Sequence, residues 1–196
     1  MNINIDSMSD EQRIEQIAQH YRSIITLIGE DVNRPGLLKT PERAAKALYF
    51  ITSGYRSDAE KTMRSALFEH DGSKVVVVRD IEFYSMCEHH ILPFYGKVSI
   101  AYLPGDSIVG LSKLARVVNI CARKLQVQER LTTDICDVVM SALDTEGVLV
   151  VCEAQHLCMK MRGVEKQESS TITMEYKGLF ETDAELRREI LQSLKS

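Results

Sequence analysis

The sequence predicts an α+β fold: an antiparallel four-stranded sheet with two helices on one face, preceded by an N-terminal helical region. Three observations predict it. Apolar residues recur at helical spacing over about the first 70 residues, and β-branched and aromatic residues become frequent from Lys74 onward. After Lys74 the order of elements is strand, strand, helix, helix, strand, strand. We therefore expect a helical region at residues 1–73 and a sheet domain at residues 74–196.

The N-terminal region is expected to hold three helices. Residues 10–30 carry apolar side chains at helical spacing, with Ser9 as the N-cap of a capping box. A second helix is expected to begin with Thr40 as its N-cap and Pro41 at its first position. A third, shorter helix is expected to begin near Asp58.

The second region alternates between strand and helix patterns. Its strands are expected over residues 75–78 with 81–84, 97–103, 148–161 and 169–176. Its helices are expected over residues 112–125 and 129–143, with a closing helix over 183–194.

Composition excludes several function classes. The 24 Lys and Arg residues against 28 Asp and Glu give a net charge of −4, which disfavours a general nucleic-acid binder. No apolar run is long enough to span a membrane, and the first residues lack the pattern of a signal peptide. The five Cys residues do not form a disulfide framework, so we expect a reduced, cytoplasmic protein.

Two clusters of metal-ligating residues stand out. One is Cys87-Glu88-His89-His90, and the other is His156-Leu157-Cys158. Zinc prefers thiolate and imidazole ligands, and a Cys and a His three residues apart on a turn can reach one ion. Either cluster alone is equally compatible with buried cysteines and surface histidines. Together they favour a metal site.

The ligand set suggests an open, catalytic zinc site. Cys87, His90 and Cys158 would leave a fourth position for water, with His89 and His156 free to move protons. In the expected strand over 148–161, alternation places His156 and Cys158 on one face, together with Lys160 and Arg162. By this criterion either His156 or Cys158 could be the ligand.

Three pairs of basic residues could bind a polyanion such as a triphosphate. The pairs are Lys113 with Arg116, Lys160 with Arg162, and Arg43 with Lys46. Any one of them is more often a solvated helix face, but three in an acidic chain suggest a function. Glu129, at a helix start, is explained equally well by the helix dipole or by recognition of a guanine edge.

Taken together, these motifs resemble GTP cyclohydrolase I. The matching segments run in the family's order from Thr40 to Phe180. They are TPERAAK, MCEHHILPFYGKVSIAYLP, VGLSKLARVVN, QVQERLT and AQHLCMKMRGV. The resemblance implies a tunnelling fold whose sheets associate into a barrel in a homodecamer, with sites between subunits. It also implies hydrolysis of GTP to formate and 7,8-dihydroneopterin triphosphate, the first step of folate and pterin biosynthesis.

The resemblance implies roles for individual residues. It assigns one Zn²⁺ per chain, with one water in the open position, to Cys87, His90 and Cys158. It assigns acid–base roles to His156, near the purine N7, and to His89, nearer the ribose. Ser112 corresponds to the residue that helps to open the ribose ring.

The substrate contacts are implied in the same way. Glu129, with the adjacent Gln128 backbone, corresponds to the guanine anchor. The triphosphate clamp corresponds to Lys113, Arg116, Arg162, Arg43 and Lys46, some of them reaching in from a neighbouring chain.

Two other functions would leave different signatures. One alternative is another tunnelling-fold enzyme. A pterin synthase would hold zinc with three His residues, and a nitrile reductase would use a catalytic Cys and lack the His-x-Cys pair. A non-catalytic zinc module would unfold when its metal is removed, whereas a catalytic zinc enzyme would mainly lose turnover.

Overall fold

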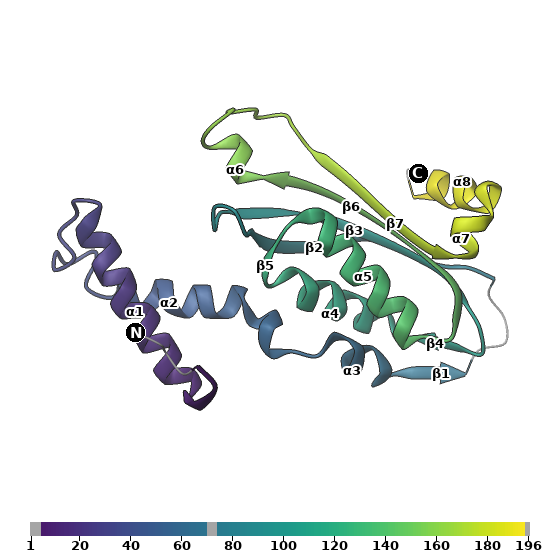
Figure 1. Cartoon of the computed structure of the whole chain (residues 1–196), viewed down its shortest axis with the longest axis horizontal. Helices are drawn as coiled ribbons and strands as arrows, with labels where there is room; N and C mark the ends of the chain where they lie inside the picture. The colour runs from purple at the N-terminus through teal and green to yellow at the C-terminus, as the bar shows by residue number, and fades with distance from the viewer. Residues whose placement is uncertain (1–4, 70–73, 195–196) are drawn as a thin grey trace. The chain divides into compact units, whose positions relative to one another are not determined.

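The computed structural model describes residues 5–69 and 74–194, and the chain divides into two compact units, residues 1–52 and 53–196 (Figure 1). The expected boundary after residue 73 lies later than this division. The difference arises because α3 (Ala59–Arg64) packs against helices α4 and α5 of the second unit.

The first unit is a pair of packed helices, α1 (Asp10–Leu27) and α2 (Thr40–Ile51), preceded by a short 3-10 turn, η1 (Ile5–Ser7). The capping box at Ser9 is confirmed, because Gln12 N–H donates to Ser9 Oγ and Ser9 N–H donates to Gln12 Oε1. The predicted cap of α2 is wrong by one residue. Lys39 is the N-cap, without a side-chain hydrogen bond, and Thr40 is the first helical residue.

The second unit begins with short elements. After η2 (Ser53–Arg56), α3 begins where a short helix was predicted. Asp58 is its N-cap, and the Asp58 carboxylate accepts from Lys61 N–H at 2.9 Å. A small sheet then pairs β1 (Leu67–Glu69) with β4 (Ser107–Val109), which the sequence did not predict.

The main sheet has five strands in the order β5-β2-β3-β6-β7. Its strands are β2 (Val76–Cys87), β3 (Pro93–Pro104), β5 (Leu125–Gln126), β6 (Thr145–His156) and β7 (Thr171–Gly178). The α+β class is confirmed, but the four-stranded antiparallel description is incomplete, because the two-residue β5 pairs parallel with the end of β2. The predicted segments 75–78 and 81–84 form a single strand, with a bulge where Asp80 takes a positive φ of 57°.

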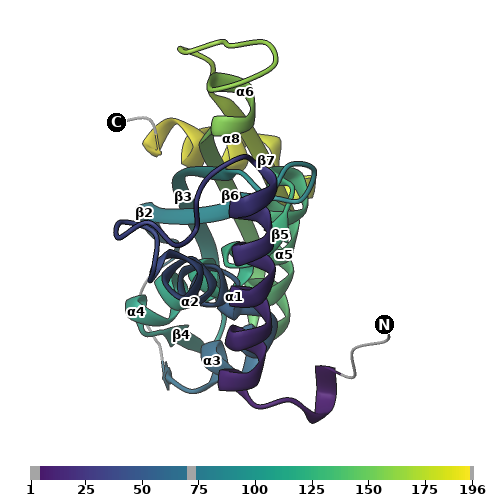
Figure 2. The same ribbon diagram turned by 90° about the vertical axis from the view of Figure 1, so that its left-hand side faces the viewer.

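Helices cover both faces of this sheet. The larger core lies between the sheet and the helices α4 (Leu111–Ala122) and α5 (Gln128–Ala142). On the opposite face, α7 (Leu179–Thr182) and α8 (Ala184–Ser193) bury a smaller core around Leu149, Phe180 and Ile190. The loop after α6 (Leu157–Lys160) projects beyond the ends of the strands (Figure 2). No helix in the described ranges is long and apolar enough to cross a membrane.

The predicted strand over 148–161 ends early. β6 stops at His156, and the next residues form α6, a single helical turn. Strand alternation therefore does not apply to Cys158, Lys160 or Arg162, and another geometry must bring Cys158 to the first cluster.

Candidate metal centre

Three side chains from the two clusters converge in space. The ligand atoms of Cys87, His90 and Cys158 all lie within 4.8 Å of one another. Cys87 is buried, Cys158 is half-buried and His90 is exposed, so the group is accessible from the His90 side. Two thiols and one imidazole match the donor preference of Zn²⁺, and three protein ligands leave a fourth position open. The residues present therefore fit a catalytic zinc ion.

The turn between β2 and β3 builds one half of this group. Cys87 N–H donates to Leu92 O and Ile91 N–H donates to Cys87 O, both at 2.8 Å. This closed turn brings His90 Nδ1 to 3.9 Å from Cys87 Sγ, and His89 Nδ1 to 3.8 Å from the same sulfur. Ile91 adopts a left-handed φ of 52°, a strained conformation for a β-branched residue that costs roughly 1–3 kcal/mol.

The other half comes from the end of β6. His156 pairs in register with Phe94, at the start of β3, and the turn α6 then brings Cys158 back to Cys87. Burial, and after it the neighbouring Cys87 thiol, raise the pKa of Cys158, while the guanidinium of Arg162 acts weakly in the opposite direction. A bound cation would reverse this, because metal coordination stabilises the thiolates.

His156, two residues before Cys158, is held in a fixed orientation. Its Nε2 is 2.8 Å from Gln128 Oε1, and its ring stacks on Phe94 with centroids 4.7 Å apart and an interplanar angle of 4°. Burial lowers the pKa of His156, and the Glu129 carboxylate partly opposes this. Burial therefore favours the neutral form of the ring. His89, with 64% of its side chain exposed, is much less constrained.

The remaining predicted residues lie on several elements. Ser112 and Lys113 lie in the first turn of α4. Arg116, further along α4, lines a cavity of about 290 Å³ together with Ser53, Ser57, Thr62, Asn119, Ile120 and Arg123. Glu129 is exposed in the first turn of α5, where it influences the pKa of His156.

The basic pairs differ in where the structure places them. Arg162 follows α6 and is exposed, whereas Lys160 donates to Gln155 Oε1 at 2.8 Å. Arg43 and Lys46 lie on α2 in the first unit, where Lys46 forms an ion pair with Glu42 at 2.5 Å.

A polar network that was not predicted from the sequence holds the turn that carries Cys87 and His90. Glu88, between the two proposed ligands of the turn, forms an ion pair with Arg130 of α5, and Glu88 N–H donates to Gln126 O at 3.0 Å. Arg130 Nε also donates to Gln126 Oε1, and Gln126 Nε2 donates to Asp134. The four-residue spacing of Gln126 and Arg130 was visible in the sequence, but its link to Glu88 depends on the unpredicted strand β5.

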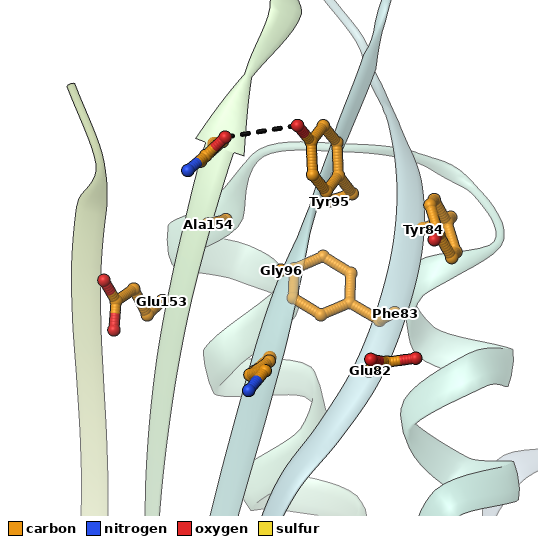
Figure 3. Close-up of a pocket in the computed structure, with 9 residues that line it drawn as sticks. Glu82, Phe83, Tyr84, Tyr95, Gly96, Glu153 and Ala154 are labelled. Atoms are coloured by element: carbon orange, nitrogen blue, oxygen red, sulfur yellow. Dashed lines mark hydrogen bonds between the residues drawn. The ribbon is translucent and has the colours of Figure 1, made fainter. Parts of the chain in front are cut away.

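A separate hollow lies on the sheet face opposite α4 and α5. It has a volume of about 450 Å³ and is lined by side chains of β2, β3 and β6, including the stacked rings of Tyr84 and Tyr95, 6.0 Å apart (Figure 3). Tyr95 OH donates to Gln155 Oε1 at 3.1 Å, and Glu82 and Glu153 lie lower on the same face. The hollow contains none of the predicted site residues.

Comparison with known proteins gives consistent matches over almost the whole chain. The model of a family described as GTP cyclohydrolase I matches residues 17–195. A protein of Parabacteroides distasonis named GTP cyclohydrolase 1 is 54% identical over 182 residues, which cover 92% of each chain. One of Pseudomonas aeruginosa, named GTP cyclohydrolase 1 2, is 50% identical and covers 91% of this chain and 99% of its own. One of Drosophila melanogaster, named GTP cyclohydrolase 1, is 50% identical over 95% of this chain and 57% of its own.

Proposed function

Because this chain belongs to the GTP cyclohydrolase I family, we propose that it is a zinc-dependent enzyme that hydrolyses GTP at C8, releases formate and forms 7,8-dihydroneopterin triphosphate. The GTP cyclohydrolase activity follows from membership of the family. What we propose in addition is the bound zinc, the product and the roles of the individual residues. The observation that carries it is the convergence of Cys87, His90 and Cys158 within 4.8 Å, from segments far apart in the sequence. When bound there, Zn²⁺ supplies Lewis acidity that lowers the pKa of water to about 7.

His156 is the proposed proton carrier for the purine. C8 of guanine is a weak electrophile, and protonation of N7 draws electron density away from it. A neutral imidazole held beside the metal group can take a proton from water and deliver it to N7. His89 and Ser112 are proposed to serve the later opening and rearrangement of the ribose, in which proton transfers recur.

Glu129 is the proposed anchor for guanine. Its carboxylate is exposed in the first turn of α5. A carboxylate accepts two parallel hydrogen bonds from the N1–H and N2–H donors of guanine. Its proximity to His156 would keep the base beside the proton carrier, with the Gln128 backbone completing the contact.

The triphosphate is proposed to bind Lys113, Arg116, Arg162, Arg43 and Lys46, some of them contributed by another chain of a homodecamer. In the isolated chain Lys46 pairs with Glu42, an exposed ion pair that exchanges at little cost. The phosphates are not consumed, so their binding energy serves to hold guanine in register with the metal and His156.

The test is to incubate the purified protein with GTP and to measure formate and the pterin chromophore, together with bound zinc. Cys158→Ser protein is expected to purify with little zinc and no activity. His156→Ser protein should retain about one zinc per chain and bind GTP without releasing formate. If His156→Ser loses its zinc while Cys158→Ser keeps it, the ligand assignment is wrong.

Metal removal separates this proposal from a structural zinc site. Chelated wild-type protein should stay folded and regain formate release when zinc is restored. Unfolding on chelation would instead support a structural metal.

A further inference from the structure

The side chain of Gln128 is buried and its amide orientation is fixed by its partners. Only 2% of the residue is exposed. Its Nε2 lies 3.0 Å from Cys152 O and 2.9 Å from Thr171 O, with Thr173 Oγ1 at 3.2 Å. The two backbone carbonyls can only accept hydrogen bonds, so the amide end that faces them must be the NH₂ group.

This orientation determines which nitrogen of His156 carries the proton. The oxygen of the Gln128 amide is directed at His156 Nε2, at 2.8 Å, and a carbonyl oxygen cannot donate. His156 Nε2 must therefore carry a hydrogen. A neutral imidazole has one N–H, which leaves the lone pair on Nδ1.

The arrangement is rigid because its partners belong to the sheet. Cys152 and Thr173 face each other across β6 and β7, and Thr171 pairs with Ala154 at the last step of the same ladder. The ring of His156 lies flat on buried Phe94, and a flipped ring would lose the hydrogen bond to Gln128.

We propose that Gln128 is a positioning residue that holds His156 in the tautomer protonated at Nε2, so that Nδ1 is the nitrogen that exchanges a proton with the substrate. The reaction in this statement rests on the proposed function, whereas the tautomer does not. Gln128 itself does not touch the reacting atoms through this side chain.

The tautomer can be measured directly. Protein labelled with ¹⁵N-histidine contains five His residues, and a His156→Asn variant assigns the signals of His156. Solid-state NMR of the sedimented zinc-loaded protein, at a pH where the ring is neutral, distinguishes a protonated ring nitrogen from a bare one. We expect a protonated Nε2 and a bare Nδ1 in the wild type.

Three variants separate positioning from folding. Gln128→Leu removes the acceptor and should give a mixture of tautomers, a kcat for formate release lower by about 10-fold to 100-fold, and little change in KM or zinc content. Gln128→Glu keeps an oxygen acceptor for Nε2–H and should keep the tautomer although it loses the donor to the two carbonyls. Thr173→Val is the matched control, because it removes a hydroxyl from the same buried cluster without touching His156.

The outcomes are distinct. A proton on Nδ1 in the wild type would overturn the proposal, and this result remains decisive if Gln128→Leu does not fold. Equal losses of kcat in Gln128→Leu and Thr173→Val would show that Gln128 is merely structural. An unchanged tautomer and kcat in Gln128→Leu would show that Gln128 does not position His156. If the wild type releases no formate at all, the proposed function fails, while the NMR result still decides the tautomer.

Discussion

The five cysteines fall into two chemical groups. Burial raises the pKa of Cys121, Cys136 and Cys152 to about 12, so these thiols are protonated and inaccessible at neutral pH. Cys87 and Cys158 instead converge on the metal group. We expect iodoacetamide at pH 8 to modify Cys158, the half-buried thiol of this pair, in chelated protein and to leave it unmodified in zinc-loaded protein. Peptide mass spectrometry identifies the alkylated cysteines. Rapid modification of the three core thiols in folded protein would contradict the expected protection.

Arg116 tests the phosphate clamp. If the triphosphate covers its guanidinium, Arg116→Ala should weaken GTP binding by roughly 2–5 kcal/mol and leave guanosine binding almost unchanged. Arg162→Ala should behave in the same way. Arg188→Ala, on the exposed face of α8, is the control. Isothermal titration with the two ligands measures the difference, and equal losses for GTP and guanosine would place these arginines outside the clamp.

Residues close in sequence were the easiest to predict. The Cys and His of the 87–90 turn are three apart, so their convergence needs only local geometry, and the capping box at Ser9 is equally local. Phe94 and the side chain of Gln128 were not predicted as parts of the site. Their contacts with His156 depend on the pairing of β3 with β6 and on the packing of α5, which periodicity in one segment does not contain.

Element types were predicted better than element ends. The helices over 111–122 and 128–142 lie within two or three residues of their expected ranges, because each carries a clear apolar stripe. The predicted end of the strand that forms β6 was wrong, because the apolar residues after His156 fit a strand and a helical turn equally well. The two residues of β5 are too few for any pattern, yet they join the turn that carries Cys87 and His90 to α5.

Gly96 is the tightest point of the pairing between β3 and β6. A Cβ there would lie 1.9 Å from Glu153 O and 2.7 Å from Ala154 Cα, so neither strand could stay in place. We expect Gly96→Ala to reduce the free energy of unfolding by roughly 3 kcal/mol or more and to lower zinc retention. Gly163→Ala is the control, because its Cβ meets nothing within 4 Å and only the positive φ of 69° opposes it, at about 1 kcal/mol. Similar midpoints for both variants in denaturant titrations would contradict this.

At the scale of the molecule, the main sheet leaves an outer edge along β7. No strand pairs with that edge in the described ranges, and Ile172 and Met174 of β7 remain exposed. An unpaired edge with exposed apolar side chains is a ready template for pairing with another chain. We expect a homo-oligomer, a decamer by the family resemblance, whose sedimentation coefficient and formate release fall together on dilution. A stable monomer of the single chain that still turns over GTP would refute this assembly.

The separation of the proposed ligands along the chain has a consequence for biosynthesis. Cys87 and His90 leave the ribosome together, but Cys158 reaches them only after β6 has been synthesised and has paired with β3. Until then a nascent chain offers a metal two of the three ligands, and two ligands hold zinc weakly. We therefore expect tight metal uptake to come late. It must follow the pairing of β3 with β6, and pairing between strands far apart in the sequence is slow. A cell that supplies zinc sparingly would then load finished sheets in preference to partly folded chains.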